Sequence, residues 1–378
     1  MEVREIKALG VKPSLLGFGC MRFPVLDDGK INEVEAERMM DYAIAQGVNY
    51  IDTAYPYHDG DSEPFTGKVM NKYPRDSYYL ASKMPLWLIE TLEDAKRIFE
   101  NQLERLEKDY IDFYLLHALN KDSFQKVKDL HIISYLEELK KEGKIRFIGF
   151  SFHDQYEVFD EILHYYPWDF CQIQLNYMDT DIQAGMKGYE EAAKLNIPVI
   201  IMEPVKGGSL VSFAEDINQM FTDVTPDRSI VSWAIRYVAS LPNVKVILSG
   251  MSTMEQVEDN LKTCTPFIPL SDAEQDAIKE IVQALHARIQ NGCTGCRYCM
   301  PCPLGVDIPA NFRVWNTYHI YNNFRVVGED WNVNLTDETK AKKCVECGKC
   351  EPLCPQQIKI REDLKKVQID LDRAKEIS

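Results

Sequence analysis

The distribution of cysteines divides this chain more strongly than any other feature of its sequence. Eight of the eleven cysteines lie in the 62 residues from Cys293 to Cys354, and the rest of the chain contains only Cys20, Cys171 and Cys264. Secreted disulfide scaffolds are usually short and rich in cysteine throughout, whereas a cysteine-dense tail on a longer chain favours bound metal. We therefore expect a cysteine-poor body over residues 1–270 and a metal-binding tail over residues 271–378, which begins with a linking helix near 271–290.

The tail cysteines form two runs that resemble the cluster-binding run of bacterial ferredoxins. These runs are Cys293-x2-Cys296-x2-Cys299-x2-Cys302-Pro303 and Cys344-x2-Cys347-x2-Cys350-x3-Cys354-Pro355. The second run matches C-x2-C-x2-C-x3-C-P, and the first is one residue short in its last gap. In this pattern the first three cysteines of each run bind one [4Fe–4S] cluster and the fourth binds the other. The expected ligand sets are Cys293, Cys296, Cys299 and Cys354 for one cluster, and Cys344, Cys347, Cys350 and Cys302 for the other.

Zinc and disulfides are the alternatives to iron–sulfur clusters in the tail. Structural zinc prefers C-x2-C pairs separated by longer loops, and three cysteines at successive x2 gaps before a Cys-Pro favour a cubane cluster instead. Disulfides are less compatible with this pattern than either metal. Between the runs, Phe312, Trp315 and Tyr318 recur at every third position, which predicts a helix with an aromatic face that packs around the clusters.

The body alternates short apolar runs with amphipathic segments. The eight apolar runs are 15–20, 49–54, 78–84, 111–118, 145–152, 170–178, 197–204 and 244–251. The helical segments are 34–48, 91–110, 135–144, 155–165, 186–196, 227–241 and 253–263. Eight apolar runs in series, seven of them followed by a helical segment, predict a (β/α)8 TIM barrel, an α/β fold.

An open doubly wound sheet is the alternative fold. That fold usually opens with a G-x-G-x-x-G turn, but the first apolar run ends Gly17-Phe18-Gly19-Cys20 without a third glycine. The segment 206–226 is the longest irregular stretch of the body. It is interpreted either as a lid over a bound cofactor or as a solvated surface loop.

Chemically active side chains follow several of the predicted strands. Asp52 comes after the second strand, Lys83 after the third, His117 after the fourth, and Tyr57 lies in the loop beyond Asp52. The carboxyl ends of barrel strands carry the catalytic residues, so these four side chains should meet. A nearby ammonium should lower the pKa of the tyrosine hydroxyl, a carboxylate should hold the lysine, and a neutral histidine can donate to a carbonyl oxygen. This set suits hydride transfer to or from a carbonyl, although each residue alone could be structural.

With these residues in place, the sequence resembles the aldo/keto reductase family over about residues 3–265. Asp52-Thr53-Ala54-Tyr55-Pro56-Tyr57, followed by Gly60-Asp61-Ser62-Glu63, is similar to the family's D-T-A-x-x-Y and G-x-S-E patterns. The resemblance implies that Tyr57 is the proton donor, that Lys83 and Asp52 tune it, and that His117 orients the substrate. It also implies a nicotinamide cofactor, with Cys20, Met21 and Asp52 beside it.

The same resemblance points to further cofactor-binding residues. Ser151 and Gln172 resemble the serine and glutamine that hold the nicotinamide carboxamide, but Phe152 replaces the asparagine that commonly follows the serine. Residues 249–262 are similar to the segment around the adenosine phosphate, with Gly250, Gln256 and Asn260 at the matched positions. Because neither Gly250 nor Gln256 is cationic, an NADP preference is weakened and both NADP and NAD stay open.

Composition restricts the partners. The formal net charge is −16, which argues against nucleic acid as a partner. There is no apolar run of about 18 residues and no apolar stretch at the N-terminus, so we expect a cytoplasmic protein without a membrane segment. The sequence does not indicate an oligomeric state.

Two functions from different classes follow. The first is an oxidoreductase that acts on a small carbonyl or alcohol, with clusters that exchange electrons with a redox protein. The second is a module that binds nicotinamide or transfers electrons without turnover, with structural clusters. A nicotinamide transfers a hydride and a cubane transfers single electrons, so a flavin that connects the two also stays open.

Overall fold

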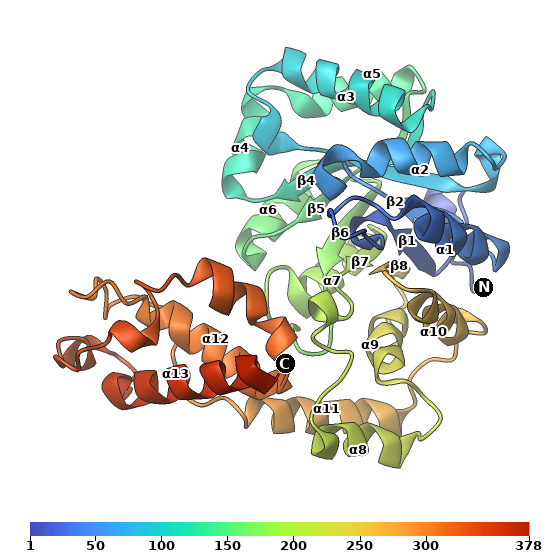
Figure 1. Ribbon diagram of the computed structural model, residues 1–378. Coiled ribbons are helices and arrows are strands. Elements are labelled where there is room, and N and C mark those ends of the chain that lie inside the picture. Colours follow the sequence, from blue (N-terminus) through green and yellow to red (C-terminus); the bar gives the residue numbers. More distant parts are fainter. Residues whose placement is uncertain (378) are drawn as a thin grey trace. The chain divides into compact units, whose positions relative to one another are not determined.

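The computed structural model describes residues 1–377 and contains a closed barrel of eight parallel strands (Figure 1). Each strand pairs with the next along the chain, and β1 closes the barrel by pairing with β8. The strands are β1 (Leu16–Gly19), β2 (Tyr50–Asp52), β3 (Tyr79–Met84), β4 (Ile111–Leu119), β5 (Ile145–Phe152), β6 (Phe170–Gln174), β7 (Val199–Met202) and β8 (Val244–Gly250). The predicted TIM barrel is therefore confirmed, and each strand falls within or close to its predicted apolar run.

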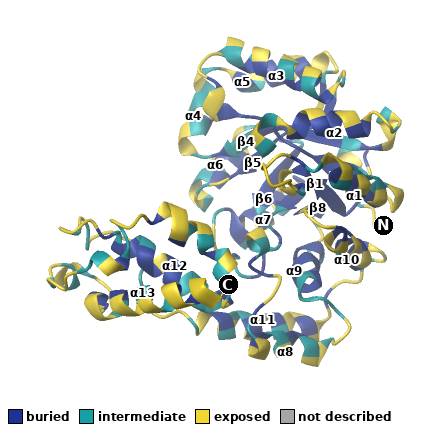
Figure 2. Cartoon of the chain, in the orientation of Figure 1, coloured by how far each residue is buried: buried dark blue, intermediate teal, exposed yellow. Residues whose placement is uncertain are grey.

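Helices connect the strands and cover the barrel. They are α1 (Glu33–Ala45), α2 (Ser62–Met70), α3 (Leu92–Leu106), α4 (Lys121–Asp129), α5 (Ile132–Lys141), α6 (Tyr156–Tyr165), α7 (Gly185–Lys194), α9 (Ile230–Ala239) and α10 (Met254–Cys264). In α3 a capping box forms between Thr91 and Asp94, and the apolar residues of this helix are buried on one side. Figure 2 shows the strands as buried and the outer helix faces as exposed.

Aromatic side chains fill the amino-terminal half of the barrel. The Phe113 ring lies 5.0 Å from each of the rings of Tyr50, Phe147 and Phe170. Ile6 and Val11, joined to each other by an antiparallel bridge, belong to the same buried cluster. This packing closes one end of the barrel and leaves the carboxyl ends of the strands for chemistry.

The chain forms two compact units, and each unit contains two separate segments of the sequence. The barrel unit contains residues 1–204 and 232–270, and the second unit contains residues 205–231 together with those from 271 onward. The segment 206–226 is not irregular as expected, because it contains α8 (Glu215–Val224). This helix buries Ile217 and Phe221 and contacts α11 (Asp272–His286) within the second unit.

The second unit is helical around a small apolar core. Its helix α12 (Ile308–Tyr321) packs against α13 (Ile360–Ile377). Phe312 and Trp315 are buried on α12, as the aromatic periodicity predicted, and the Trp315 indole donates to Asp370 Oδ2 at 2.7 Å. The cysteine loops lie against this core. None of the helices within residues 1–377 has the length and apolar character needed to cross a bilayer.

Candidate functional site

The four residues predicted to be catalytic meet at the carboxyl ends of the strands. Asp52, Tyr57 and His117 line one cavity of about 290 Å³ in the barrel unit. Lys83 is fully buried, and its Nζ donates to Asp52 Oδ1 at 2.7 Å and to the Thr53 carbonyl at 2.8 Å. Its ammonium lies 5.0 Å from the centre of the Tyr57 ring, which is 6.1 Å from the His117 ring. The structure therefore brings an acid, an ammonium, a phenol and an imidazole together.

The loop that carries Tyr57 is held from both sides by an arginine of α3. Arg105 donates to the carbonyls of Tyr55 and Gly60. It also pairs with the buried Glu63 at 3.3 Å, and Glu63 accepts hydrogen bonds from Ser82 and Gln102. The serine–glutamate part of the sequence pattern is thus structural, because it fixes the backbone on which Tyr57 stands.

His117 lies at an irregularity of β4. The register between β4 and β5 shifts between Leu116 and Leu119, and Ala118 adopts a positive φ of 54°. The Ala118 amide donates to Ser151 Oγ at 2.8 Å, which stabilises this conformation. Bulges of this kind redirect a side chain and are common beside active sites, and here the side chain is that of His117.

Burial dominates the protonation of the site. It raises the pKa of Tyr57, although the nearby Lys83 ammonium acts in the opposite direction. The expected net lowering of this pKa is therefore wrong, and Tyr57 carries its proton at neutral pH. Burial, with a smaller contribution from the Lys83 charge, holds the pKa of His117 well below its usual value, so its ring is neutral.

The Lys83–Asp52 pair keeps an ammonium in this buried site. Burial alone would lower the pKa of Lys83, but the charge of Asp52 and contact with Tyr57 outweigh it and raise this pKa. Burial raises the pKa of Asp52 against the opposing effect of Lys83. A charged lysine beside a protonated tyrosine is suited to stabilise the phenolate that proton donation leaves.

Two of the predicted nicotinamide ligands are positioned to bind a carboxamide. Ser151 and Gln172 line the cavity with Met21 and Gly250. Gln172 Oε1 is buried without a hydrogen-bond partner within the described residues, so it can accept from an amide nitrogen. Since Ser151 Oγ accepts from a backbone amide, its own hydrogen can be donated to an amide oxygen. These donors and acceptors fit a nicotinamide carboxamide. Phe152 is instead buried against Phe159.

Other predicted cofactor residues do not line this cavity. Cys20 is completely buried, and burial raises the pKa of its thiol to about 12, which makes it an inert side chain. Asn260 donates to Ser249 Oγ at 2.8 Å in the interior. Gln256 accepts from the Ser252 amide next to the start of α10. Asn260 and Gln256 thus hold Ser249 and Ser252, which lie at and just beyond the end of β8.

The cavity also contains residues outside the predicted catalytic and cofactor-binding sets. Arg22, His153 and Glu203 line it from the ends of β1, β5 and β7. Trp87, in the loop after β3, places its ring 5.0 Å from that of His117 and is about half exposed. The position of Trp87 four residues after Lys83 was the one signal that could have identified it.

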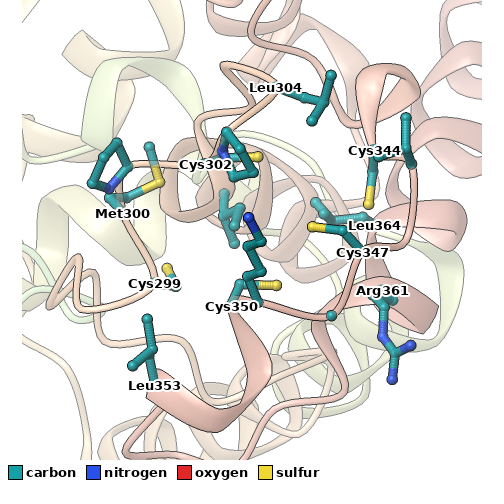
Figure 3. Close-up of a pocket in the computed structure, with 16 residues that line it drawn as sticks. Cys299, Met300, Cys302, Leu304, Cys344, Cys347, Cys350, Leu353, Arg361 and Leu364 are labelled. Carbon is teal, nitrogen blue, oxygen red and sulfur yellow. The ribbon is translucent and has the colours of Figure 1, made fainter.

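The eight tail cysteines are grouped into two sets of four within the second unit. One cavity is lined by Cys302, Cys344, Cys347 and Cys350 together with Cys299, which also lines the other cavity, and Figure 3 shows the sulfur atoms of the first four turned toward a common space. Another cavity is lined by Cys293, Cys296, Cys299 and Cys354. Each set therefore combines three cysteines of one run with the last of the other, as the ferredoxin pattern requires.

The surroundings of these thiols suit iron–sulfur clusters better than hydrated metal ions. Apolar side chains, among them Met300, Leu304, Ile308 and Leu353, line the first cavity. Phe312 and Ile358 line the second. All-thiolate donor sets in apolar surroundings are typical of cubane clusters, whose potentials depend on burial.

The fold and these two sites define the class: a TIM-barrel oxidoreductase with an additional cysteine-rich domain. The chain belongs to the aldo/keto reductase family, whose family model matches residues 15–283, more than half of its length. A 4Fe-4S dicluster domain matches residues 292–358. Members of the family use NAD(P)H.

Known relatives align with the larger part of this chain. L-galactose dehydrogenase of Arabidopsis thaliana is 25% identical over 315 residues, with 77% of this chain and 96% of the relative covered. The NADH-specific methylglyoxal reductase of Escherichia coli is 26% identical over 283 residues, 63% of this chain and 85% of the relative. Among solved structures, the holo form of an aldo-keto reductase from Bacillus halodurans has a TM-score of 0.62 and 27% identity, over 74% of this chain and 96% of that one.

Proposed function

We propose that this protein is an NAD(P)H-dependent oxidoreductase that interconverts a small carbonyl compound and its alcohol, and that its tail holds two [4Fe–4S] clusters for electron transfer. The observation that carries this proposal is the buried Lys83–Asp52 pair of 2.7 Å beneath Tyr57, in a cavity shared with His117. Burying a charged pair this deeply costs desolvation free energy. Here the pair lies next to a protonated phenol.

The residues of the cavity divide the reaction between them. When bound, the nicotinamide supplies or accepts a hydride. Tyr57 donates its proton to the carbonyl oxygen, and the Lys83 ammonium stabilises the phenolate that remains. Neutral His117 donates a hydrogen bond to the same carbonyl oxygen as it gains charge. In alcohol oxidation the same groups act in reverse.

Binding of the nicotinamide would depend on Ser151 and Gln172, with Met21 beside the ring. Asp52 acts on this site through Lys83, from which it accepts a hydrogen bond. Of the positions near the end of β8, neither Gly250 nor Gln256 provides a cation, so the chain lacks the usual basis for preferring a 2′-phosphate. The name of the E. coli relative, an NADH-specific enzyme, supports the use of NADH.

The two cysteine sets would bind one cluster each, and a cluster exchanges single electrons with its partner. Cys296 and Cys347 are exposed, so each site reaches the surface of the second unit. A redox protein is therefore the expected partner of the tail, in addition to the small-molecule substrate of the barrel.

The test is anaerobic purification of the full chain, followed by iron and sulfide analysis, nucleotide titration and a substrate screen. The screen includes methylglyoxal with NADH and NADPH, and L-galactose with both oxidised nucleotides, because relatives act on these compounds. We expect turnover of a carbonyl or alcohol. Nucleotide binding without turnover of any tested compound would favour the non-catalytic alternative, and absence of nucleotide binding would contradict the proposal.

A further inference from the structure

Arg22 is a cation of the catalytic cavity that forms no ion pair within residues 1–377. Arg22 ends the short 3-10 helix Cys20–Arg22 that follows β1, and it lines the cavity with Tyr57 and His117. Its backbone carbonyl is fixed by the Ser252 hydroxyl at 2.7 Å. Within the described residues its guanidinium makes neither an ion pair nor a hydrogen bond.

This lack of a partner is unusual in an acidic chain. Most of its arginines pair with a carboxylate. Glu203 lines the same cavity but forms no ion pair with Arg22. The charge of Lys83 is already compensated by Asp52. The guanidinium thus leaves an uncompensated positive charge in a chain whose net charge is −16.

The end of β8 has space for the Arg22 side chain because residue 250 is a glycine. A Cβ atom at Gly250 would lie 2.7 Å from Arg22 Cγ and 2.9 Å from Arg22 Cβ, closer than such atoms normally approach. The glycine therefore leaves room for the arginine stem. Since Gly250 and Gln256 are both uncharged, Arg22 brings to this end of β8 a cation that β8 itself does not supply.

We propose that Arg22 is the oxyanion-binding residue of the catalytic cavity, where its guanidinium binds either a phosphate of the nucleotide or a carboxylate of an acidic substrate. The inference rests on the proposed function, because it assumes that ligands of that reaction occupy this cavity. Guanidinium groups bind phosphate and carboxylate through two parallel hydrogen bonds, which a neutral side chain cannot replace.

The test uses the full chain with its clusters, kept anaerobic, and compares Arg22→Met with Arg22→Lys and with the control Arg97→Met on the outer helix α3. Dissociation constants for NADH and NADPH are measured by fluorescence titration. Inhibition by succinate is compared with inhibition by the neutral succinamide. Arg22→Met should weaken one oxyanion ligand about tenfold, Arg22→Lys should weaken it less, and Arg97→Met should leave it unchanged. The difference should shrink at high salt.

The pattern of losses identifies the ligand. Weaker binding of both nucleotides indicates the diphosphate, weaker binding of NADPH alone indicates the 2′-phosphate, and loss of succinate inhibition alone indicates a substrate carboxylate. Gly250→Ala should weaken the same ligand, because Arg22 must then move. If the wild type binds no nucleotide the proposed function fails, while direct binding of succinate to the wild type and to Arg22→Met, measured by titration calorimetry, still reports on Arg22. Equal constants for wild type and Arg22→Met in every titration would overturn the inference.

Discussion

Replacing Asp52 with asparagine should destabilise the barrel far more than the loss of one surface charge would. The Lys83 side chain is fully buried and that of Asp52 is 4% exposed. Removing one partner of a buried ion pair leaves the other charge uncompensated, which typically costs about 3–5 kcal/mol. By contrast the side chains of the Lys68–Glu33 pair are 62% and 53% exposed, and such pairs contribute about 0–1 kcal/mol.

The same substitution should also change the chemistry. Asp52 is the main group that raises the pKa of Lys83 against burial. Without it, burial should lower this pKa and so weaken the stabilisation of the Tyr57 phenolate by the Lys83 ammonium. Turnover should fall by orders of magnitude and recover in part under more acidic conditions, where more of Lys83 is protonated.

The assay is urea unfolding of the anaerobic protein, followed by circular dichroism for the whole chain and by visible absorption for the cluster-binding unit. Glu33→Gln is the matched control. The double variant Asp52→Asn/Lys83→Met, which removes both charges, should recover most of the stability but no activity. The control should have a free energy of unfolding within about 1 kcal/mol of the wild type. If Asp52→Asn does so too, the buried-pair reasoning is refuted.

Three further predictions concern the clusters, the packing of the barrel and its pH dependence. Cys302→Ser should remove iron from the Cys344-containing set alone and so halve the iron content, whereas Cys264→Ser should leave it unchanged; loss of all iron or none would contradict the crossed ligand sets. Gly67→Ala should lower the stability of the barrel by about 1–3 kcal/mol, because the new Cβ would overlap the Leu106 carbonyl of α3; thermal unfolding at the wild-type midpoint would count against this packing. Below about pH 6.5 the unfolded chain protonates the His117 ring but the folded barrel does not. Stability should therefore fall as the pH drops, and His117→Gln should show a shallower pH dependence in urea unfolding.

Local patterns predicted the barrel and the side chains that meet at the carboxyl ends of its strands. Strands buried on both faces appear in the sequence as continuous apolar runs. Residues at the carboxyl ends of barrel strands converge regardless of the conformation of the loops. The order of residues along the chain was therefore enough to place Asp52, Lys83 and His117 together. The cysteine spacing predicted which cysteines line the two cavities of the second unit, because it reflects a local chain geometry. The short helices α2 and α4 were missed, since nine-residue helices with mixed polarity give little periodic signal.

Features that depend on distant contacts were not predictable. Helix α8 is stabilised by α11, some fifty residues further along the chain, so the segment 206–226 seemed irregular. The direction of the Tyr57 pKa shift depended on burial, which the sequence does not state. Arg22 lies close to Gly250 although the two residues follow β1 and end β8, at opposite ends of the barrel sequence.

Transfer of deuterium is the most direct test of the central claim, that the barrel performs hydride chemistry with Tyr57 as its proton donor. The wild type, Tyr57→Phe and the control Tyr42→Phe, on the outer helix α1, are each incubated anaerobically with nicotinamide deuterated at the transferred position and the best carbonyl substrate. Mass spectrometry then measures the label in the alcohol. We predict that the wild type and Tyr42→Phe form alcohol carrying one deuterium and that Tyr57→Phe forms it at a rate lower by about two to four orders of magnitude. Unlabelled alcohol from the wild type, or an unchanged rate in Tyr57→Phe, would contradict the account.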